Sequence, residues 1–231
     1  MIEYNERSIV PVIPKLDGST VILRYMTLDK FRWLVENSAL YFPRVDDEAF
    51  KDQNEIYVTE INARTFGLTL DEFKGQCERD RRRAFINCWT ISGHEQQDMW
   101  DKFTSATDGV VIRSTVGRLM ESGKTEDKIY ISKVRYYNPD EESANPFGER
   151  LNTNWLLASK SNKFVNEREL RLFRFEDTDE HSHFIAEVDL RILIDEVIVC
   201  PKADTGYLES VQDLLQSHGL GAVKVSASSL R

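Results

Sequence analysis

The chain has 231 residues, and 30 basic against 39 acidic side chains give it a formal charge of −9. Glycine and proline number only 11 and 6, which excludes collagen, long flexible linkers and low-complexity repeats. No apolar run approaches the ~18 residues that cross a bilayer, and the polar, acidic start leads us to expect no export signal. The acidic balance argues against a protein that coats nucleic acid or an anionic membrane.

The three cysteines, Cys77, Cys88 and Cys200, form no Cys-x-x-Cys pair. Their odd number and wide spacing argue against a disulfide framework or a zinc ribbon and suit a reducing compartment. At this length a single domain is the expected organisation. We therefore expect a cytoplasmic, globular protein with one domain over 1–231, in which 1–19 is a lead-in arm and 20–231 is the core.

In the first half of the chain, hydrophobic spacing predicts both strands and helices. Residues 20–26 and 39–42 are β-branched or apolar and are typical of strands, and apolar residues at helical spacing lie between them. Thr69 and Glu72 form a capping-box pattern at the start of a polar helix. The elements expected here are strands at 20–26, 39–42, 84–92 and 109–115, and helices at 28–38, 54–66, 69–83 and 96–103.

The second half is expected to consist mainly of strands. They lie at 128–137, 168–175, 183–190, 195–200 and 222–228, with helices at 155–164 and 205–219 and a long loop at 138–150. The βαβ rhythm of a parallel sheet is missing, so the pattern predicts an α+β fold with a largely antiparallel sheet. No Gly-x-Gly-x-x-Gly or Gly-Lys-Ser/Thr loop occurs, and the Rossmann and P-loop nucleotide sites therefore lack their motif.

A charged run at the start of the 168–175 strand carries the most informative candidate residues. Because strand side chains alternate between faces, Glu167, Glu169 and Arg171 are expected on one face. Two carboxylates ~7 Å apart beside a guanidinium can divide the work of catalysis. One can orient a substrate hydroxyl while the other supports cationic charge in a transition state. The alternative is a solvent-exposed, charge-balanced sheet face, which is common in antiparallel sheets.

Residues near the ends of two other strands are candidates for ligand binding. Arg24 can hold a phosphate through two hydrogen bonds, and Tyr25 can stack on a ring. Thr90 and Ser92 share a strand face, so their hydroxyls can meet a ribose or an amide. The alternatives are an Arg24 paired with a surface carboxylate, a Trp89 packed in the core, and hydroxyls that merely end a strand.

A carboxylate-rich loop and an arginine cluster complete the candidates. The loop residues Asp46, Asp47, Glu48, Asp52 and Glu55 could supply oxygen ligands to Mg²⁺ or Ca²⁺, although their spacing is not that of an EF-hand. A solvated acidic loop is the other interpretation, and we assign no metal ligand. Four arginines, Arg79, Arg81, Arg82 and Arg83, either complement a helix dipole or contact nucleic acid.

Several of these short pieces occur in a recognisable order. They are Arg24-Tyr25, the 39–42 strand with Phe50-x-Asp52-x-x-Glu55, Cys88-Trp89-Thr90-x-Ser92, Met99-Trp100, Gly109, Lys163 and Glu167-x-Glu169-x-Arg171. Over about residues 20–200 this set resembles a bacterial family catalogued only as a domain of unknown function. That family has Phe-Ser where this chain has Trp89-Thr90 and a Tyr where it has Phe103, and its loop carries an Asn and a Pro that 50–53 lacks.

The layout of that family is similar to that of ADP-ribosyltransferases, which place a basic residue on the first strand, hydroxyls on the next and a Glu-x-Glu late in the chain. The resemblance implies a split, largely antiparallel sheet core flanked by helices, with NAD as the substrate. It assigns Glu169 to the ribose 2′-hydroxyl and to the oxocarbenium charge that develops when the nicotinamide–ribose bond breaks, as in glycoside cleavage. It assigns Glu167 to orienting or deprotonating the accepting group.

The resemblance also implies a set of residues that bind NAD. Arg24 anchors pyrophosphate or ribose, hydroxyls line the ribose pocket, and an aromatic side chain covers a ring of the ligand. The set consists of Arg24, Tyr25, Trp89, Thr90, Ser92 and Arg171. Such a cleft needs no glycine-rich loop.

We therefore expect an NAD-dependent ADP-ribosyltransferase that acts as a bacterial toxin or phage-defence effector. Its expected partners are a protein or nucleic-acid acceptor, bound transiently, and an antitoxin or regulatory protein, with no membrane partner. Two alternatives stay open. One is a non-catalytic interaction or regulatory domain of the same fold, and the other is a metal-dependent nuclease or phosphoesterase that uses the carboxylates of 46–55.

Overall fold

An eight-stranded sheet forms the centre of the protein. We describe residues 9–11, 16–47, 58–104, 107–145 and 154–230 of a computed structural model of the chain. Within these ranges the sheet strands are β1 (Ile9–Pro11), β2 (Val21–Met26), β4 (Ala84–Ile91), β5 (Val110–Thr115), β6 (Ile129–Lys133), β9 (Glu169–Phe175), β11 (Glu196–Val199) and β12 (Lys224–Ala227). Their order is β1-β6-β9-β4-β2-β5-β11-β12, and all neighbours are antiparallel except β1–β6 and β11–β12.

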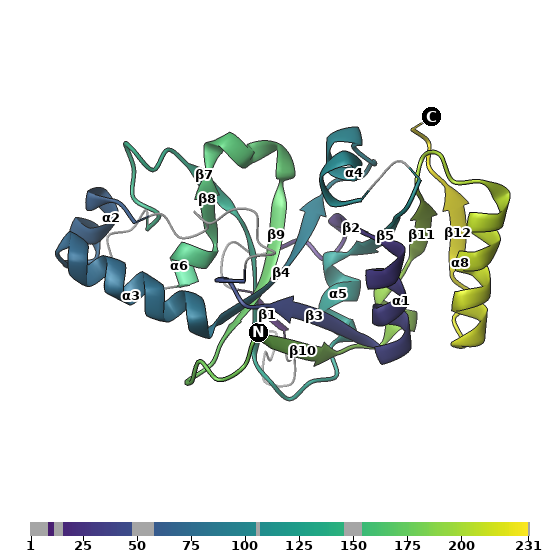
Figure 1. Ribbon diagram of the computed structural model, residues 1–231, viewed down its shortest axis with the longest axis horizontal. Coiled ribbons are helices and arrows are strands. Elements are labelled where there is room, and N and C mark those ends of the chain that lie inside the picture. Colours follow the sequence, from purple (N-terminus) through teal and green to yellow (C-terminus); the bar gives the residue numbers. More distant parts are fainter. Residues whose placement is uncertain (1–8, 12–15, 48–57, 105–106, 146–153, 231) are drawn as a thin grey trace.

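Two small sheets and the helices flank this sheet. β3 (Ala39–Pro43) pairs antiparallel with β10 (His183–Glu187), and β7 (Arg135–Tyr137) pairs parallel with β8 (Ser159–Ser161). The helices are α1 (Leu28–Asn37), α2 (Glu60–Thr65), α3 (Leu70–Arg83), α4 (Gln97–Phe103), α5 (Val116–Ser122), α6 (Asn154–Leu157), α7 (Leu190–Leu193), α8 (Thr205–Ser217) and the 3₁₀ helix η1 (Asn162–Glu167). Figure 1 shows α2 and α3 at one end of the molecule and α8 at the other. The expectation of a mixed helix and strand fold with a large, mostly antiparallel sheet is confirmed.

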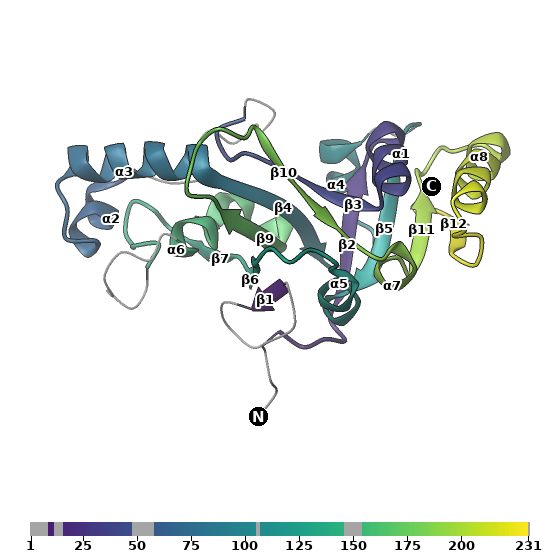
Figure 2. The same ribbon diagram turned by 90° about the horizontal axis from the view of Figure 1, so that it is seen from below.

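The sheet is divided between its two central strands, β2 and β4. They share only two residue pairs, Ile22–Ile91 and Leu23–Thr90, whereas β4 and β9 share seven and β2 and β5 share six. Figure 2 shows β4 running obliquely to β2 and β5. We call this junction the seam. It joins a half sheet built on β9 and β4 to one built on β2, β5 and β11.

Hydrophobic residues cover both faces of the sheet near the seam. Ile22 of β2 and Trp89 of β4 belong to the largest core cluster, which also contains Phe31 of α1. On the other face, Leu23 packs in a second cluster with Trp100 of α4. Because successive strand residues point to opposite faces, β2 is buried on both sides. The seam is therefore held in place by α1 on one face and α4 on the other.

The capping signal expected at the start of α3 (Leu70–Arg83) is confirmed. The side chain of Thr69 accepts the N–H of Glu72, and the Glu72 carboxylate accepts the N–H of Thr69, so α3 begins with the expected capping box. The helix expected at 54–66 corresponds to α2, and 54–57 lie outside the described residues. Capping boxes are read from two polar residues three positions apart, which is why the sequence locates α3 well.

The expectation of one continuous helix at 155–164 is only partly correct. α6 and the 3₁₀ helix η1 cover its two ends, but the strand β8 separates them. Ser159, Lys160 and Ser161 are all buried in β8, and Lys160 forms ion pairs with two carboxylates. A helix turns consecutive side chains about its axis and would expose one of the three. Tertiary contacts of a buried lysine therefore override a helix-like spacing.

The strand expected over 128–137 is two strands, β6 and β7. The Val134 N–H donates to the Glu169 carbonyl at 2.9 Å, whereas the next N–H, that of Arg135, donates to the Ala158 carbonyl at 2.8 Å. The chain leaves the main sheet at this point and pairs with β8. The residue pattern does not indicate this exchange of partners, because residues with a high strand propensity, such as Ile131, Val134 and Tyr136, occur on both sides of it.

The charged run at 167–171 does not form one continuous strand. Arg168 adopts a left-handed conformation with φ 45°, ends η1 and places Glu167 before the first residue of β9. The expectation that Glu167 shares a strand face with Glu169 and Arg171 is therefore wrong. The bend nevertheless brings the two carboxylates together, because the Lys160 ammonium bonds to both.

Three short elements are missing from the sequence-based expectation. β1 lies within the 1–19 arm and pairs parallel with β6. α5 follows β5 directly, with the Thr115 side chain accepting the Arg118 N–H, and α7 is a single turn capped by Asp189. Elements of three to seven residues are too short for hydrophobic periodicity to reveal.

Candidate functional site

A pocket opens at the point where the seam between β2 and β4 stops. The last pair of the seam is Leu23–Thr90. Continuing that register would place Arg24 opposite Trp89, yet the strands separate and all four residues line a hollow of about 320 Å³. The lining is made of Leu23, Arg24, Tyr25, Cys88, Trp89, Thr90, Met99, Phe103, Glu167 and Glu169. Divergence of two central strands therefore creates the site.

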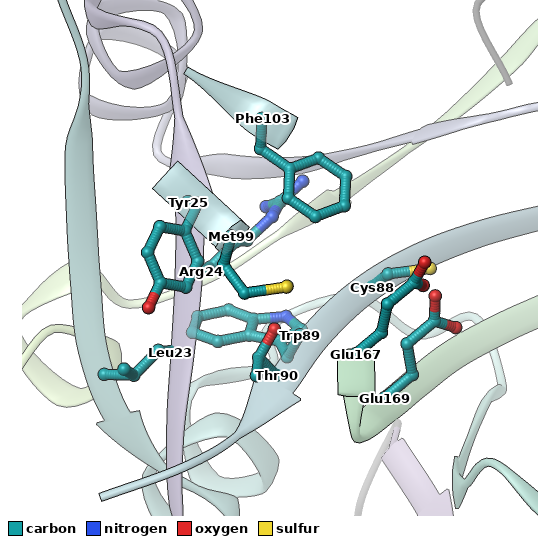
Figure 3. A pocket seen from close by; sticks show the side chains of 10 residues that line it. All are labelled: Leu23, Arg24, Tyr25, Cys88, Trp89, Thr90, Met99, Phe103, Glu167 and Glu169. Atoms are coloured by element: carbon teal, nitrogen blue, oxygen red, sulfur yellow. The ribbon is translucent and has the colours of Figure 1, made fainter. Parts of the chain in front are cut away.

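Two carboxylates form one side of this pocket. Glu167 comes from the end of η1 and Glu169 from the first residue of β9, which pairs with Thr90 of β4. Figure 3 shows the two carboxylates side by side next to Cys88, across the pocket from Arg24 and Phe103. The structure thus brings both proposed catalytic residues to the same pocket as the proposed binding residue Arg24.

Three cationic side chains, of which Lys160 and Arg171 are buried, hold the carboxylates in place. Lys160 Nζ lies 2.9 Å from Glu167 Oε2 and 3.0 Å from Glu169 Oε1. Arg171 Nε lies 2.6 Å from Glu169 Oε2, and Arg171 also donates to the Leu157 carbonyl at 2.9 Å. Lys102 of α4 donates to Glu167 Oε1. Each carboxylate oxygen therefore has a cationic partner and a fixed direction.

The environment moves the two carboxyl pKa values in opposite directions. Burial raises the pKa of Glu167, the neighbouring Glu169 carboxylate raises it further, and the lysines only partly offset this. Burial also acts to raise the pKa of Glu169, but the Arg171 guanidinium, a hydrogen bond with Glu167 and Lys160 outweigh it and lower that pKa. Glu169 is therefore held ionised, whereas the carboxyl of Glu167 holds a proton more readily than an ordinary glutamate does.

Arg24 is the cation of the pocket that has no carboxylate. Its guanidinium lies 5.8 Å from the centre of the Trp89 ring, and it has no ion-pair or hydrogen-bond partner among the described residues. Burial lowers the pKa of Arg24 to about 10, so the side chain stays charged at neutral pH. A charged guanidinium without a partner can bind an anionic ligand without first breaking a protein ion pair.

The sum of charges in the pocket also favours an anion. Four cationic groups, Arg24, Lys102, Lys160 and Arg171, stand around two carboxylates. Counted over these described side chains alone and with all of them ionised, 4 − 2 leaves an excess of two positive charges in a chain whose net charge is −9. A local excess of this sign favours the binding of anionic groups.

Trp89 and Tyr25 are packed differently from what stacking on a ligand ring would require. Trp89 is buried beneath Arg24 and its indole N–H donates to Asn87. Tyr25 packs edge-on against Trp100, its hydroxyl accepts the Gln96 N–H, and burial raises its pKa to about 12. Both rings line the pocket as walls, but neither offers a free face to a ligand ring.

Two of the proposed binding residues lie outside the pocket lining. Ser92 follows the end of β4, and its hydroxyl donates to the His94 carbonyl at 2.6 Å. Arg171 has 0% of its surface exposed and reaches the site only through Glu169. Arg171 is therefore placed to position Glu169 rather than to touch a ligand. Thr90, in contrast, lines the pocket between Trp89 and the carboxylates, as Figure 3 shows.

The sequence did not point to several residues of the site. Lys160 lies in a segment that resembles a helix, and Lys102 and Phe103 end the short helix α4. A lysine flanked by two serines and buried between carboxylates cannot be told from a surface lysine by residue type alone. The one available signal for α4 was its Met99-Trp100 pair, of which Met99 lines the pocket.

The other candidate constellations do not assemble a site in the described residues. Asp46 is paired with Arg44 at 2.5 Å, and residues 48–57 of the acidic loop lie outside the description. Within the described ranges no three His, Cys, Asp or Glu residues are grouped so that they could hold a metal ion. In the arginine cluster, Arg79 donates to Gln76 and Arg83 to the Glu176 carbonyl.

Comparisons with known proteins add no family. The chain matches no protein-family model, and no curated protein is significantly similar to it in sequence. In the part of the chain that the structure describes, no helix is long and apolar enough to cross a membrane. The function therefore has to be argued from the seam pocket itself.

Proposed function

We propose that the protein is an NAD-dependent ADP-ribosyltransferase with an ADP-ribosyltransferase-like split sheet, and that the seam pocket is its active site. One observation carries the proposal. Two adjacent carboxyls whose pKa values are shifted in opposite directions, Glu167 and Glu169, face an unpaired guanidinium, Arg24, across one pocket. A fixed carboxylate, a proton-exchanging carboxyl and an anion-binding cation are the three groups that nucleotide glycosyl transfer requires.

The roles follow from the partners of each group. Arg24 holds the pyrophosphate of NAD⁺. When the bond between ribose C1′ and the nicotinamide nitrogen breaks, the electron pair leaves with neutral nicotinamide and the ribose gains oxocarbenium character. Glu169, ionised and oriented by Arg171 and Lys160, stabilises that charge and holds the 2′-hydroxyl. Glu167 accepts the proton of the incoming nucleophile.

The size of the pocket limits which part of NAD⁺ it takes. The hollow of about 320 Å³ includes open solvent, and its enclosed part measures only about 50 Å³, well below the ~300–1,000 Å³ typical of small-molecule sites. The pocket therefore takes only the reacting part of the ribose between the carboxylates and Arg24, and most of NAD⁺ lies outside it. Because Arg24 binds the pyrophosphate in this proposal, the pocket needs no glycine-rich loop for phosphate binding.

Arg24→Gln is the sharpest test, because it removes a binding charge without leaving a buried carboxylate unpaired. We expect NAD⁺ hydrolysis and transfer to an acceptor in a cell lysate to fall about 10- to 100-fold, the cost of losing a charged hydrogen bond, with the melting temperature unchanged. Arg32→Gln, on the exposed side of α1, is the matched control and should behave as wild type.

Retention of full NAD⁺ turnover by Arg24→Gln would contradict the proposed role of Arg24. Absence of NAD⁺ binding and hydrolysis by the wild-type protein would remove the proposal and favour a non-catalytic domain of the same architecture.

A further inference from the structure

The mouth of the seam pocket carries exposed apolar side chains. Among the described residues the exposed large hydrophobics are Tyr41, Leu70, Phe103, Val165, Ile185 and Ile192. One of these six, Phe103, is 41% exposed and lines the pocket, and another, Val165, is 51% exposed and lies in η1 two residues before the lining residue Glu167. Figure 3 shows the Phe103 ring at the edge of the pocket opposite the carboxylates. Lys102 Nζ lies 5.3 Å from the centre of the Phe103 ring, but the exposure of this ring leaves part of it open to a ligand, whereas Trp89 and Tyr25 are buried.

Unpaired cations accompany this apolar surface. Lys163 and Arg168 are exposed residues at the two ends of the segment that supplies Glu167, and neither side chain has an ion-pair partner among the described residues. Of the cations elsewhere on this acidic chain, Arg64, Arg135 and Lys224 each have a carboxylate within 2.7 Å, whereas Lys30 and Arg32 of α1 have no ion-pair partner among the described residues either. We call Phe103, Lys163, Val165 and Arg168 the rim.

We infer that the acceptor for the proposed transfer is single-stranded nucleic acid, which docks on the rim with a base stacked on Phe103 and its phosphates on Lys163 and Arg168. Stacking of bases on exposed aromatic rings together with cations along the backbone is how single strands are bound without sequence readout. An acidic protein segment would satisfy the cations but would leave the Phe103 face without a flat partner. A duplex would keep its bases stacked and out of reach.

The chemistry balances within the groups already named, and this step rests on the proposed function. A base nitrogen uses its lone pair to form a bond to ribose C1′ as the bond from C1′ to nicotinamide breaks. Neutral nicotinamide leaves with the bonding pair, and the proton of the attacking nitrogen passes to the Glu167 carboxylate. Stacking on Phe103 brings a base to the pocket edge that faces Glu167.

Oligonucleotide binding tests the rim independently of catalysis. We expect fluorescein-labelled 12-nucleotide single strands of DNA and RNA to bind with an affinity that falls with salt. The double variant Lys163→Gln/Arg168→Gln should weaken binding about tenfold and reduce the magnitude of the salt slope by about 1.4, since each lost phosphate contact contributes about 0.7 on a single strand. Phe103→Ala should weaken it about tenfold at all salt concentrations.

The matched control is Lys30→Gln/Arg32→Gln, which removes the same two charges from the exposed surface of α1 and should leave binding unchanged. Equal losses in both double variants would mean that only net charge matters, and would overturn the rim. Duplex binding as tight as single-strand binding would overturn it as well.

Transfer from ³²P-labelled NAD⁺ then identifies the acceptor. Label on the oligonucleotide, reduced at least fivefold in the rim double variant, supports the inference. NAD⁺ hydrolysis with label only on protein overturns the inference and leaves the proposed function standing. Oligonucleotide binding that depends on the rim, without any NAD⁺ turnover, contradicts the proposed function and the transfer step, and keeps only the docking surface.

Discussion

The two glutamates of the pocket are structurally unequal, although they stand two residues apart. Glu169 accepts from the buried Nε of Arg171 and from the buried ammonium of Lys160. Glu167 shares Lys160 with Glu169, and its other partner, Lys102, has 39% of its side chain exposed. Removal of the Glu169 charge therefore takes a carboxylate from two buried cations, Arg171 and Lys160, whereas removal of the Glu167 charge takes one from Lys160 and from the partly exposed Lys102.

Glu169→Gln is accordingly expected to lower the free energy of unfolding by about 3–5 kcal/mol, as breaking one side of a buried ion pair does. Glu167→Gln should cost about 1 kcal/mol, because Lys160 keeps Glu169 and Lys102 reaches solvent. Urea unfolding at pH 7 measures both values. Glu60→Gln, in the exposed pair with Arg64, is the control and should change stability by less than about 0.5 kcal/mol. Equal losses in the two pocket variants would contradict the asymmetry.

The lowered pKa of Glu169 determines how this residue makes the stability of the protein depend on pH. The pKa of Glu169 is lower in the folded than in the unfolded protein, so its contribution to stability is complete above the unfolded value of about 4.3 and is lost as the pH falls through the folded value. In Glu169→Gln the loss of stability below pH 5 should therefore be shallower than in the wild type. A steeper acid limb in the variant would contradict this linkage.

At the residue scale the sequence identifies groups with unusual chemistry but not their partners. Charged residues near strand ends are recognisable candidates for catalysis or anion binding, and Glu167, Glu169 and Arg24 are identified in this way. Lys160 is not, because its function depends on burial between two carboxylates that come from other elements. For Arg171 the sequence suggests the wrong role. Its residue type indicates ligand binding, but its complete burial means that it positions Glu169 instead.

At the scale of elements, α4 is attached to the end of the chain through one carboxylate. Glu95, just before α4, accepts hydrogen bonds from Ser228 Oγ and from the N–H and hydroxyl of Ser229. It also accepts the indole N–H of Trp100 at 3.0 Å. The segment after β12 thereby fixes the helix that carries the pocket residues Met99 and Phe103.

Glu95→Ala should therefore loosen the α4 wall of the pocket. We expect a loss of at least about 2 kcal/mol in the free energy of unfolding, since even one hydrogen bond to a charged acceptor contributes about 1.5–3 kcal/mol and Glu95 accepts four. We also expect faster amide exchange in 97–103. Hydrogen–deuterium exchange followed by mass spectrometry measures the second effect. Glu209→Ala, on the exposed surface of α8, is the control. Unchanged exchange in α4 would show that Glu95 does not position it.

Elements with their own local signals are the ones that the sequence places correctly. α3 has its capping box and β5 its run of β-branched residues, and both are found where they are expected. The error at 155–164 arises because β8 is defined by its pairing with β7 and by the burial of Lys160, both of which are tertiary. Left-handed backbone conformations are usually predicted from a glycine, but here the residue is Arg168. The sequence therefore does not predict the bend between Glu167 and Glu169 either.

At the scale of the whole molecule, the seam determines where the pocket lies. Each half sheet is held by longer ladders than the two pairs that join β2 to β4. The pocket draws Arg24 and Tyr25 from one half and Cys88, Glu167 and Glu169 from the other. A sequence can indicate an antiparallel sheet, but it does not predict how many residue pairs two neighbouring strands form. For β2 and β4 that number depends on tertiary packing, which includes α1 and α4.

A ligand that spans the seam should tie the two half sheets together. We expect saturating NAD⁺ to raise the melting temperature, because binding to the folded state alone stabilises it by RT ln(1 + [L]/Kd). It should also slow amide exchange in both 21–26 and 84–92, with little change in 205–217, which lies far along the sheet (Figure 1). Arg24→Gln is the control, since it keeps the seam but lacks the proposed anchor. Protection confined to one half sheet, or equal protection in 205–217, would contradict binding across the seam.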